Sequence, residues 1–324
     1  MIKAAIIGLG RWGQILVESV QGQSEHIQFT AGVTRTPAKA VDFTKLHGIP
    51  LLDDYTQVLD DPAIDAVVLA TPHSQHVDQV VAAAAAGKHI FVEKPFTLTE
   101  TDAKKAVAAA DRASMVLALG HNRRFLPAIA EVRRLLADGE LGQALHVEAN
   151  FSGASGFDYK GDQWRASAAE TPSGGMAGSG IHMVDAMIGL FGPIERIHAL
   201  SLRQVLVDEI DDTTSMLFGF ENGMSGYLAA LSATASLWRL QVFGSKGWAE
   251  IRDERRLEVR LIGVESKVVD YPFFDTRRAE LEAFAVAARG GPAYPLPVDQ
   301  AIHGVAVFEA ITRSAMSGQT ETTG

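Results

Sequence analysis

The first third of the chain alternates short, uninterrupted apolar runs with segments in which apolar residues recur at helical spacing. The short runs are β-branched or aliphatic without a polar alternate, as expected for parallel strands that helices cover on both faces. Such alternation is typical of βαβ units. Strands are predicted at residues 3–8, 29–34, 66–70, 89–93 and 116–120.

Helix ends can also be read from the sequence. Thr99 is expected to cap a helix that runs to Ser114, with Asp102 three residues on in the capping-box position. Gly87 is expected to end the alanine-rich helix that precedes residues 89–93.

After about Asn122 the pattern changes to a period of two, most clearly in residues 256–261, Arg-Leu-Glu-Val-Arg-Leu. This period predicts an open, mainly antiparallel sheet with one solvated face. Asn222-Gly223 is a hairpin signal between two of its strands. The further strands are expected at 145–151, 194–202, 213–220, 224–231 and 238–243, and helices near 182–190, 277–288 and 298–317.

Composition narrows the class of protein. The 324 residues suggest about two domains, and a formal net charge of −10 disfavours nucleic acid and anionic membranes as partners. The absence of cysteine removes disulfides, thiolate nucleophiles and cysteine metal sites, and no dense His/carboxylate cluster predicts a metal. With no signal-like or membrane-spanning apolar run, a soluble cytoplasmic protein is expected.

A glycine-rich turn, Gly8-Leu9-Gly10-Arg11-Trp12-Gly13, follows the first strand and opens a helix. Gly8 permits a tight turn, Gly10 lets a pyrophosphate approach the backbone, and Gly13 allows close packing of helix on strand. The sequence therefore predicts an α/β Rossmann dinucleotide-binding domain over residues 1–121. An α+β substrate-binding and oligomerisation domain follows over residues 122–324, with the last helix as a candidate to pack back on the first domain.

Cofactor choice depends on the end of the second strand, where an acidic residue would bind the ribose hydroxyls of NAD. The segment there carries no carboxylate but has Thr34, Arg35 and Lys39. A hydroxyl, a guanidinium and an ammonium suit a 2′-phosphate, so NADP is favoured. In the alternative, Arg35 and Lys39 are solvated charges and NAD binds through backbone groups.

Motifs after the later strands carry a family resemblance. They are Ala70-Thr71-Pro72, Glu93-Lys94-Pro95, Asn122-Arg123-Arg124-Phe125, Trp164-Arg165, Gly174-Gly175, and Gly180-Ile181-His182 with Asp185. With the glycine turn, the chain resembles, over its whole length, the Gfo/Idh/MocA oxidoreductases, the family of glucose–fructose oxidoreductase and inositol dehydrogenase.

The resemblance implies that Lys94 is the general acid/base and that His182 binds or relays the proton of the reacting hydroxyl. Burial and a positive nicotinamide would lower the pKa of a lysine toward a useful range. The alternatives are a surface lysine paired with Glu93 and a helix-start histidine bonded to backbone. Gly178, four residues before His182, stands where the family commonly has Asp, so the substrate or proton relay is expected to differ.

Other residues complete the predicted site. The loop of residues 152–173, with Asp158, Tyr159, Lys160 and Asp162, is expected to face the substrate. The Arg123-Arg124 pair is either a ligand contact or a structural ion pair, Asp185 has a helix-local alternative, and Trp164 can instead pack under its loop. His73 and His76 follow the third strand near the cofactor cleft, though His76 has a solvated helix face as its alternative. The predicted substrate-binding residues are Lys94, Arg123, Trp164, Arg165, His182 and Asp185. The predicted cofactor-binding residues are Gly8, Gly10, Arg11, Trp12, Gly13, Thr34, Arg35, Lys39, Ala70, Thr71, Pro72, His76, Glu93 and Lys94.

Together these residues predict an NAD(P)-dependent oxidoreductase that moves hydride between nicotinamide and a carbinol carbon of a sugar, cyclitol or related polyol. Two alternatives stay open: redox-assisted lyase or hydrolase chemistry on the bound nucleotide, and a non-catalytic cofactor-binding regulatory protein. The resemblance also implies a homodimer or homotetramer formed through the open sheet, since large apolar sheet faces rarely stay solvated.

Overall fold

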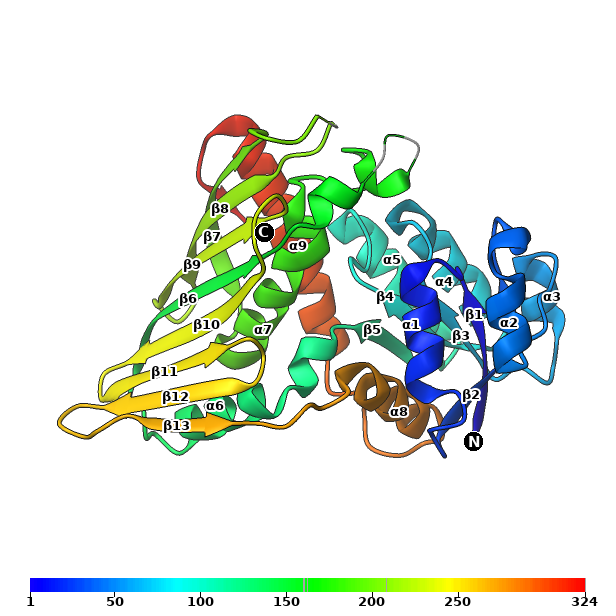
Figure 1. Cartoon of the computed structure of the whole chain (residues 1–324), viewed down its shortest axis with the longest axis horizontal. Helices are drawn as coiled ribbons and strands as arrows, with labels where there is room; N and C mark the ends of the chain where they lie inside the picture. Colours follow the sequence, from blue (N-terminus) through cyan, green and yellow to red (C-terminus); the bar gives the residue numbers. More distant parts are fainter. Residues whose placement is uncertain (160, 162, 208, 324) are drawn as a thin grey trace. The chain divides into compact units, whose positions relative to one another are not determined.

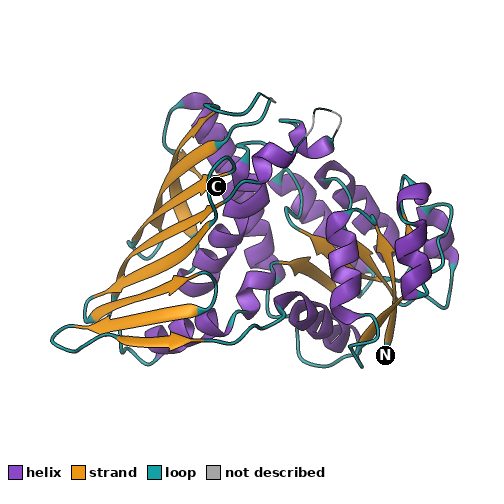
Figure 2. Ribbon diagram, viewed as in Figure 1, coloured by secondary structure: helices purple, strands orange, loops and turns teal. Residues whose placement is uncertain are grey.

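A computed structural model describes residues 1–159, 161, 163–207 and 209–323. The chain forms two compact units, shown in Figures 1 and 2. Unit 1 comprises Met1–Asn122 and Asp275–Ala301, and unit 2 comprises Arg123–Phe274 and Ile302–Gly324. The first segment of unit 1 ends within one residue of the predicted boundary at 121. The segment Asp275–Ala301 was expected in the second domain but groups with the first.

Unit 1 is built on a five-stranded parallel sheet in the order β2-β1-β3-β4-β5. The chain order reverses between β1 and β3, which makes their carboxyl ends the topological switch point where such folds bind ligands. The predicted strands are confirmed with small shifts of their ends. Their bounds are β1 Ile2–Ile7, β2 Ile27–Val33, β3 Ala66–Leu69, β4 His89–Glu93 and β5 Leu117–Gly120.

One helix start and one helix end in unit 1 lie where the sequence predicts them. The Thr99 hydroxyl accepts from the Asp102 N–H at 3.1 Å, which confirms the predicted cap. Gly87 adopts φ +69° just after the alanine-rich helix, which also matches its predicted role. The helices are α1 Arg11–Val20, α2 Val41–His47, α3 Tyr55–Asp60, α4 His76–Ala85, α5 Glu100–Arg112 and α8 Thr276–Ala288.

Helix α8 joins unit 1 because it packs on the Rossmann sheet and on α1. The Phe284 ring lies 5.8 Å from that of Phe91 in β4. Arg278 Nε donates to the Ser19 carbonyl at 2.7 Å, at the end of α1. Apolar burial and a buried backbone acceptor thus tie a late segment of the sequence to the first strands and helices.

Unit 2 contains a nine-stranded sheet in the order β13-β12-β11-β10-β6-β9-β8-β7-β14. All pairs are antiparallel except β6 with β9. The strands β11, β13 and β14 were not predicted; each is recruited by pairing with a neighbour. The bounds are β6 Ala144–Ser152, β7 Ile194–Leu202, β8 Thr213–Phe220, β9 Ser225–Leu231, β10 Leu237–Gly244, β11 Gly247–Arg252, β12 Arg256–Leu261, β13 Lys267–Asp270 and β14 Glu321–Thr322.

One face of this sheet is buried and the other is exposed. Val147, Met216, Leu228 and other alternate residues are buried on the inner face. Helix α7 Ile181–Phe191, buried along nearly its whole length, contacts β6. The chain also forms two further helices, α6 Pro127–Ala137 and α9 Val298–Ser317. The first residues of α9 belong to unit 1 and the rest to unit 2.

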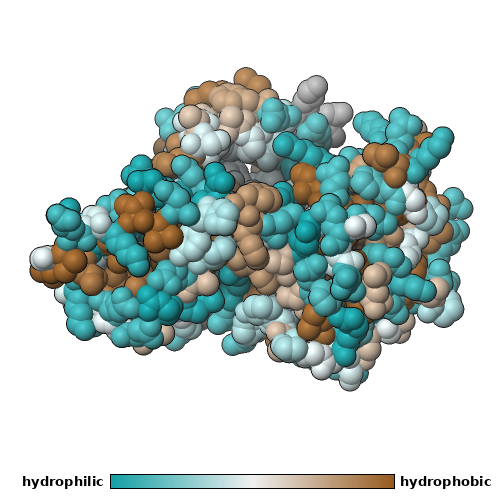
Figure 3. Space-filling view, turned by 60° about the horizontal axis from the view of Figure 1, so that its bottom comes forward, coloured by the Kyte–Doolittle hydropathy of each residue, from teal (hydrophilic) through white to brown (hydrophobic). Residues whose placement is uncertain are grey.

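The outer face carries large apolar side chains. Leu200 and Leu217 are each 57% exposed, and Leu202 and Leu237 are also exposed. The strand register places these residues on the same side, together with the Arg239–Glu148 ion pair at 2.7 Å. Hydrophobic residues also lie among hydrophilic ones on the molecular face drawn in Figure 3. None of the helices in the described part of the chain combines the length and apolar character that crossing a bilayer requires.

Candidate functional site

The glycine turn of unit 1 is shaped by two close backbone approaches. Gly8 has φ +101°, and a Cβ there would lie 2.5 Å from the Ala70 carbonyl oxygen. A Cβ on Gly13 would lie 1.9 Å from the Gly8 carbonyl oxygen. These two positions admit glycine alone, and both geometric roles predicted for them are confirmed.

Gly10 differs from the other two glycines, because none of the described residues outside the local chain places a heavy atom within 4 Å of where its Cβ would be. It precedes α1, whose first turn has no side-chain cap and no acidic residue. The first N–H groups of a helix are left without intrahelical partners and favour an anion. Open space over Gly10 and an uncapped helix N-terminus therefore fit the pyrophosphate of a dinucleotide.

The segment after β2 is open to solvent. Arg35 and Lys39 are exposed, and Thr34 is half-buried. Arg11, at the start of α1, is exposed as well, whereas Trp12 is half-buried with its indole Nε1 inaccessible. The cationic side chains are thus available to a ligand, while direct cofactor contact by any of them stays a prediction.

The carboxyl end of β3 is tied to α4. The Thr71 hydroxyl donates to Gln79 Oε1 at 2.6 Å, and the His76 ring Nε2 lies 3.1 Å from the Thr71 carbonyl oxygen. His76 is fully buried, so the alternative of a solvated helix face is wrong. His73 is also buried, with its ring 5.9 Å from that of His76. Cofactor contact by His76, Ala70, Thr71 or Pro72 stays a prediction.

At the carboxyl end of β4, Glu93 is only 5% exposed and Lys94 is half-buried. The Lys94 N–H donates to Glu93 Oε2 at 3.3 Å, and the Lys94–Pro95 peptide bond is cis. Gly120, the register partner of Glu93 on β5, has its Cβ position 2.7 Å from Glu93 Oε1. The acidic side chain thus packs against backbone, and the lysine follows it at the ligand-binding edge of the sheet.

In unit 2, His182 is the second residue of α7 and is 3% exposed. A π-helical turn, Met176–Gly180, precedes it, and such turns are frequent at functional sites. The Phe151 ring lies 6.1 Å from the His182 ring. Among the residues that the structure describes, the Tyr159 hydroxyl is the atom outside the local helical backbone that comes closest to the Cβ position of Gly178, at 3.9 Å, so these residues leave space for a side chain there.

The two arginines after β5 have different partners. Arg124 Nε lies 2.8 Å from Asp185 Oδ2 in a buried ion pair, which confirms the structural alternative for this residue. Arg123 Nε bonds Glu254 at 2.8 Å, and its guanidinium lies 5.2 Å from the Phe151 ring centre. Asp185 lies one helical turn after His182 on the same helix, which fits the alternative of a local role within that helix. Substrate contact by Asp185 or Arg123 stays a prediction.

The loop of residues 152–173 is anchored to the sheet. The Gly156 N–H donates to the Ser232 carbonyl at 2.8 Å. The Arg165 guanidinium carbon lies 4.0 Å from the centre of the Trp164 ring, so this pair is a cation–π contact. Lys160 and Asp162 lie outside the described residues. Whether the loop faces substrate stays a prediction.

The carboxylate of Asp212 holds the segment that follows β7. Asp212 Oδ2 accepts three backbone N–H groups, from Gln204, Val205 and Leu206, at 2.7–3.0 Å. Burial would raise the pKa of Asp212, but these bonds and one from the Thr213 hydroxyl hold it below its ordinary value. The carboxylate therefore fixes the backbone that follows β7.

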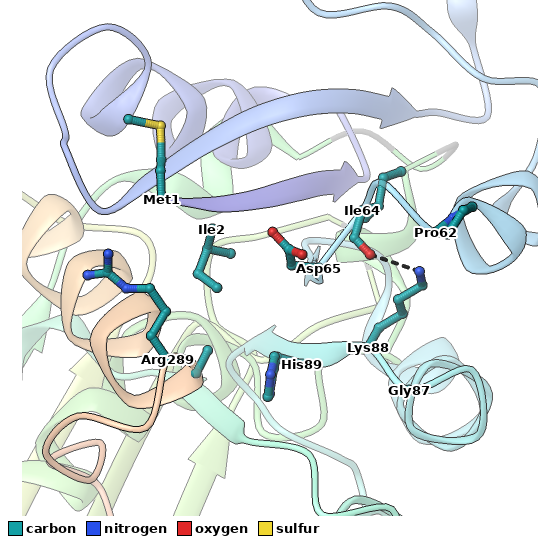
Figure 4. A pocket seen from close by; sticks show the side chains of 10 residues that line it. Met1, Ile2, Pro62, Ile64, Asp65, Gly87, Lys88, His89 and Arg289 are labelled. Atoms are coloured by element: carbon teal, nitrogen blue, oxygen red, sulfur yellow. Dashed lines mark hydrogen bonds between the residues drawn. The ribbon is translucent and has the colours of Figure 1, made fainter.

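A cavity of about 440 Å³ lies in unit 1 at the amino ends of the strands, and Figure 4 shows the side chains that line it. Lys88 Nζ donates to the carbonyls of Asp61 and Ile64 at 2.6 and 2.8 Å. His89 Nδ1 accepts the Val116 N–H at 3.1 Å, and burial lowers the pKa of His89 while Asp65 opposes that shift. The cavity lies at the opposite edge from the glycine turn and Lys94, and none of the predicted site residues lines it.

Comparison with known proteins connects these features. Residues 2–121 match a family model described as an oxidoreductase family with an NAD-binding Rossmann fold. Residues 129–250 match the model of the GFO/IDH/MocA C-terminal domain. The chain belongs to the Gfo/Idh/MocA oxidoreductase family. Its resemblance, its Rossmann and open-sheet architecture and its place among NAD(P)-dependent oxidoreductases are therefore confirmed.

Two relatives and one solved structure are similar to this chain at low identity over most of its length. The scyllo-inositol 2-dehydrogenase (NAD(+)) of Bacillus subtilis is 28% identical over 90% of this chain and 87% of the relative. The rhizopine catabolism protein MocA of Rhizobium meliloti is 26% identical over 96% of this chain and 94% of the relative. Aldose-aldose oxidoreductase from Caulobacter crescentus, solved with glycerol, has a TM-score of 0.89 at 25% identity, covering 99% of both chains.

Some features of this Gfo/Idh/MocA chain were missed from the sequence. Phe151 beside His182 was predicted only as part of a strand. Gly120 was predicted only as a strand end, although its position on the strand next to Glu93 is a signal that could have revealed the close approach. The contacts of His76 with the segment after β4 had no sequence signal, because they depend on three-dimensional packing of α4.

Proposed function

We propose that this protein is an NAD(P)-dependent dehydrogenase that oxidises a carbinol carbon of a sugar, cyclitol or related polyol, or reduces the matching carbonyl. One observation carries the proposal: the glycine turn and Lys94 lie at the same carboxyl edge of one parallel sheet. The names of relatives that act on an inositol and an aldose support a polyhydroxylated substrate.

Lys94 takes or returns the hydroxyl proton at its Nζ. The side chain of Lys94 extends from a buried part of the main chain, because its neighbours Glu93 and Pro95 are both buried. A charged ammonium there also stabilises the alkoxide form of the substrate. When bound, the nicotinamide supplies or accepts the hydride.

His182 holds the reacting hydroxyl or relays its proton. Imidazole titrates close to neutral pH and can donate or accept a hydrogen bond. The Phe151 ring and the buried start of α7 restrict the orientations of the histidine ring. Substrate recognition by Arg123, Trp164, Arg165 and Asp185 is part of the same proposal.

The function is tested by following nicotinamide absorbance with a panel of polyols and sugars, with NAD and NADP supplied separately. Net formation of reduced cofactor is expected. Lys94→Ala is expected to lower kcat by at least about 100-fold, since general acid–base catalysis contributes about 10²–10⁴. Lys104→Ala, which removes an exposed lysine paired with Glu100, is the matched control and keeps full activity.

Two outcomes would replace this function. Turnover without net change of the cofactor would favour redox-assisted lyase or hydrolase chemistry. Tight cofactor binding without turnover on any polyol would favour a regulatory role, an alternative that the absent side chain at Gly178 keeps open.

The proposal includes a preference for NADP. Arg35 and Lys39 are exposed cations after β2, where the segment 33–39 has no carboxylate to bind ribose hydroxyls. Arg35→Ala is expected to raise the NADP dissociation constant at least about tenfold and that of NAD by less than about threefold. Lys45→Ala in α2 is the control. Equal dissociation constants of the unmodified protein for NAD and NADP would contradict the proposed preference for NADP.

We further propose a homodimer or homotetramer formed through the outer face of the nine-stranded sheet. Leu200, Leu217 and Leu237 form an apolar surface that association would remove from water. Light scattering is expected to give a multiple of the 34.7 kDa chain mass. Leu217→Lys is expected to shift it toward monomer, whereas Leu46→Lys, on exposed α2 of unit 1, leaves it unchanged.

A further inference from the structure

His76 links the two loops that follow β3 and β4. Its ring Nδ1 lies 3.0 Å from the Pro95 carbonyl oxygen and 3.1 Å from the Phe96 carbonyl oxygen. Its Nε2 lies 3.1 Å from the Thr71 carbonyl oxygen. All of these atoms belong to unit 1, and the ring is fully buried.

Carbonyl oxygens only accept hydrogen bonds, so a ring nitrogen must carry the proton in each hydrogen bond, and a neutral imidazole donates from one of its two nitrogens. Nδ1 faces two carbonyl oxygens and Nε2 faces one, which favours the tautomer with the proton on Nδ1, and this tautomer holds residues 95–96. Two of the three contacts are to residues 95 and 96, directly after Lys94. A side chain of similar shape without N–H groups would leave those buried carbonyls facing an apolar ring, which is costly.

The ring is held from a rigid element. His76 is the first residue of α4, and Val80, Ala83 and Ala84 bury the inner side of that helix. Thr71 has a second link to the same helix through Gln79, one turn after His76. Loss of the His76 ring therefore leaves the Thr71 loop attached to α4 through Gln79, while the contacts of the ring with the Pro95 and Phe96 carbonyls are lost.

We propose that His76 is a positioning residue that fixes the backbone origin of Lys94. A lysine has four rotatable bonds, so the direction of its Nζ depends on a fixed main chain at its base. Misplacement of a reacting group by about 1 Å can cost about 100-fold in rate. This inference rests on the proposed role of Lys94 and adds to it a residue that does not touch substrate.

The test compares His76→Phe with His76→Asn. His76→Phe is expected to lower kcat by about 10- to 100-fold, with KM for the polyol changed by less than about threefold. His76→Asn, which can donate one N–H, is expected to recover part of that loss. If His76→Phe does not fold, the kcat of His76→Asn against that of the unmodified protein carries the test.

Tyr55→Phe is the matched control, because the Tyr55 hydroxyl donates to the Gln79 carbonyl of the same helix at 2.9 Å. It is expected to lower stability while kcat is kept. Equal kcat for His76→Phe, His76→Asn and the unmodified protein would overturn the inference, as would an equal loss in Tyr55→Phe. If Lys94→Ala retained full turnover, the proposed function itself would fail, a result distinct from both.

Discussion

The carboxylate of Glu93 occupies the space that any side chain at Gly120 would need. The two residues are register partners at the ends of β4 and β5, and the Gly120 Cβ position lies 2.7 Å from Glu93 Oε1 and 3.1 Å from Oε2. Close approach of an acidic side chain to a strand backbone is thus possible only because residue 120 is glycine. The arrangement fixes Glu93 directly before the proposed catalytic lysine.

Gly120→Ala is therefore expected to displace the Glu93 side chain. The expected cost is about 1–3 kcal/mol of unfolding free energy, as for overpacking at other buried sites, with a loss of kcat. Chemical denaturation and steady-state kinetics measure the two effects. Gly304→Ala in α9 is the control, because among the described residues the Ile188 Cδ1 atom, at 4.0 Å, is the one outside its own helix that its Cβ would meet. A similar loss of stability there would remove the explanation.

Gly178 is expected to accept a side chain. The Tyr159 hydroxyl at 3.9 Å from its Cβ position is an ordinary contact, so Gly178→Ala should raise stability by about 0.5–1 kcal/mol. Gly178→Asp is expected to fold and to change the ranking of kcat/KM among polyols, because it adds a carboxylate one turn before His182. An unchanged ranking would show that this space does not bear on substrate choice.

A neighbouring glycine provides the contrast. A Cβ on Gly180 would lie 2.4 Å from Met176 Sδ and 3.1 Å from the Ala230 side chain, so Met176 must move. Gly180→Ala is expected to lose about 1–3 kcal/mol of unfolding free energy. The opposite signs of the two alanine variants, measured by thermal unfolding, test the geometry of the π-helical turn.

The buried pair of Arg124 and Asp185 is expected to be structural. The Arg124 guanidinium carbon lies 3.2 Å from the Cβ position of Gly189, so α7 is closely packed against it. Arg124→Leu leaves a buried carboxylate and is expected to cost about 3–5 kcal/mol, measured by denaturation. Combining it with Asp185→Leu is expected to restore most of this loss. No recovery in the double variant would show that the two side chains do not stabilise the fold as a pair.

Acid sensitivity is expected from His89. Burial lowers its pKa from the ordinary 6.5, so the unfolded chain binds a proton here more readily than the folded protein. Its contribution to stability is present above pH 6.5 and is lost as pH falls from 6.5 through the lower pKa of the folded state. Protonation of Nδ1 would also break its bond with the Val116 N–H.

Thermal unfolding between pH 5 and 8 measures this effect. His89→Asn keeps an acceptor for Val116 but does not titrate, so its melting temperature should fall less than that of the unmodified protein below pH 6.5. If the melting temperatures of the two proteins fell equally with pH, groups other than His89 would cause the loss of stability in acid.

Much of the fold was predicted from the periodicity of hydrophobic residues and from the residues that begin or end helices. Uninterrupted apolar runs located all strands of the parallel sheet, and β4, β7, β8, β12 and α9 have the predicted bounds. Gly87 and Thr99 ended and began helices as expected, because their conformational and hydrogen-bonding properties act within a few residues. Strand β11 was missed because its pairing with β10 and β12 is tertiary.

The candidate site divides in the same way. The close packing at Gly8 and Gly13 was predicted from the sequence, because glycine turns depend on local geometry. Lys94 and His182 were predicted from the family resemblance of their motifs, and their roles stay predictions. The solvated alternative for His76 was wrong, since burial is decided by which elements pack on α4. The choice between ion pair and ligand contact for Arg124 also needed the structure, because its partner Asp185 lies on a different helix.

The sequence by itself determined the family, the order of the two sheets and the glycine turn, since these depend on residue type and short-range spacing. The tertiary structure decided what lies against each motif. It brought α8 onto the Rossmann sheet, placed the Glu93 carboxylate over Gly120 and set the His76 ring between two loops. Such contacts join residues far apart in the chain, and their energies depend on close packing and paired donors that no local pattern records.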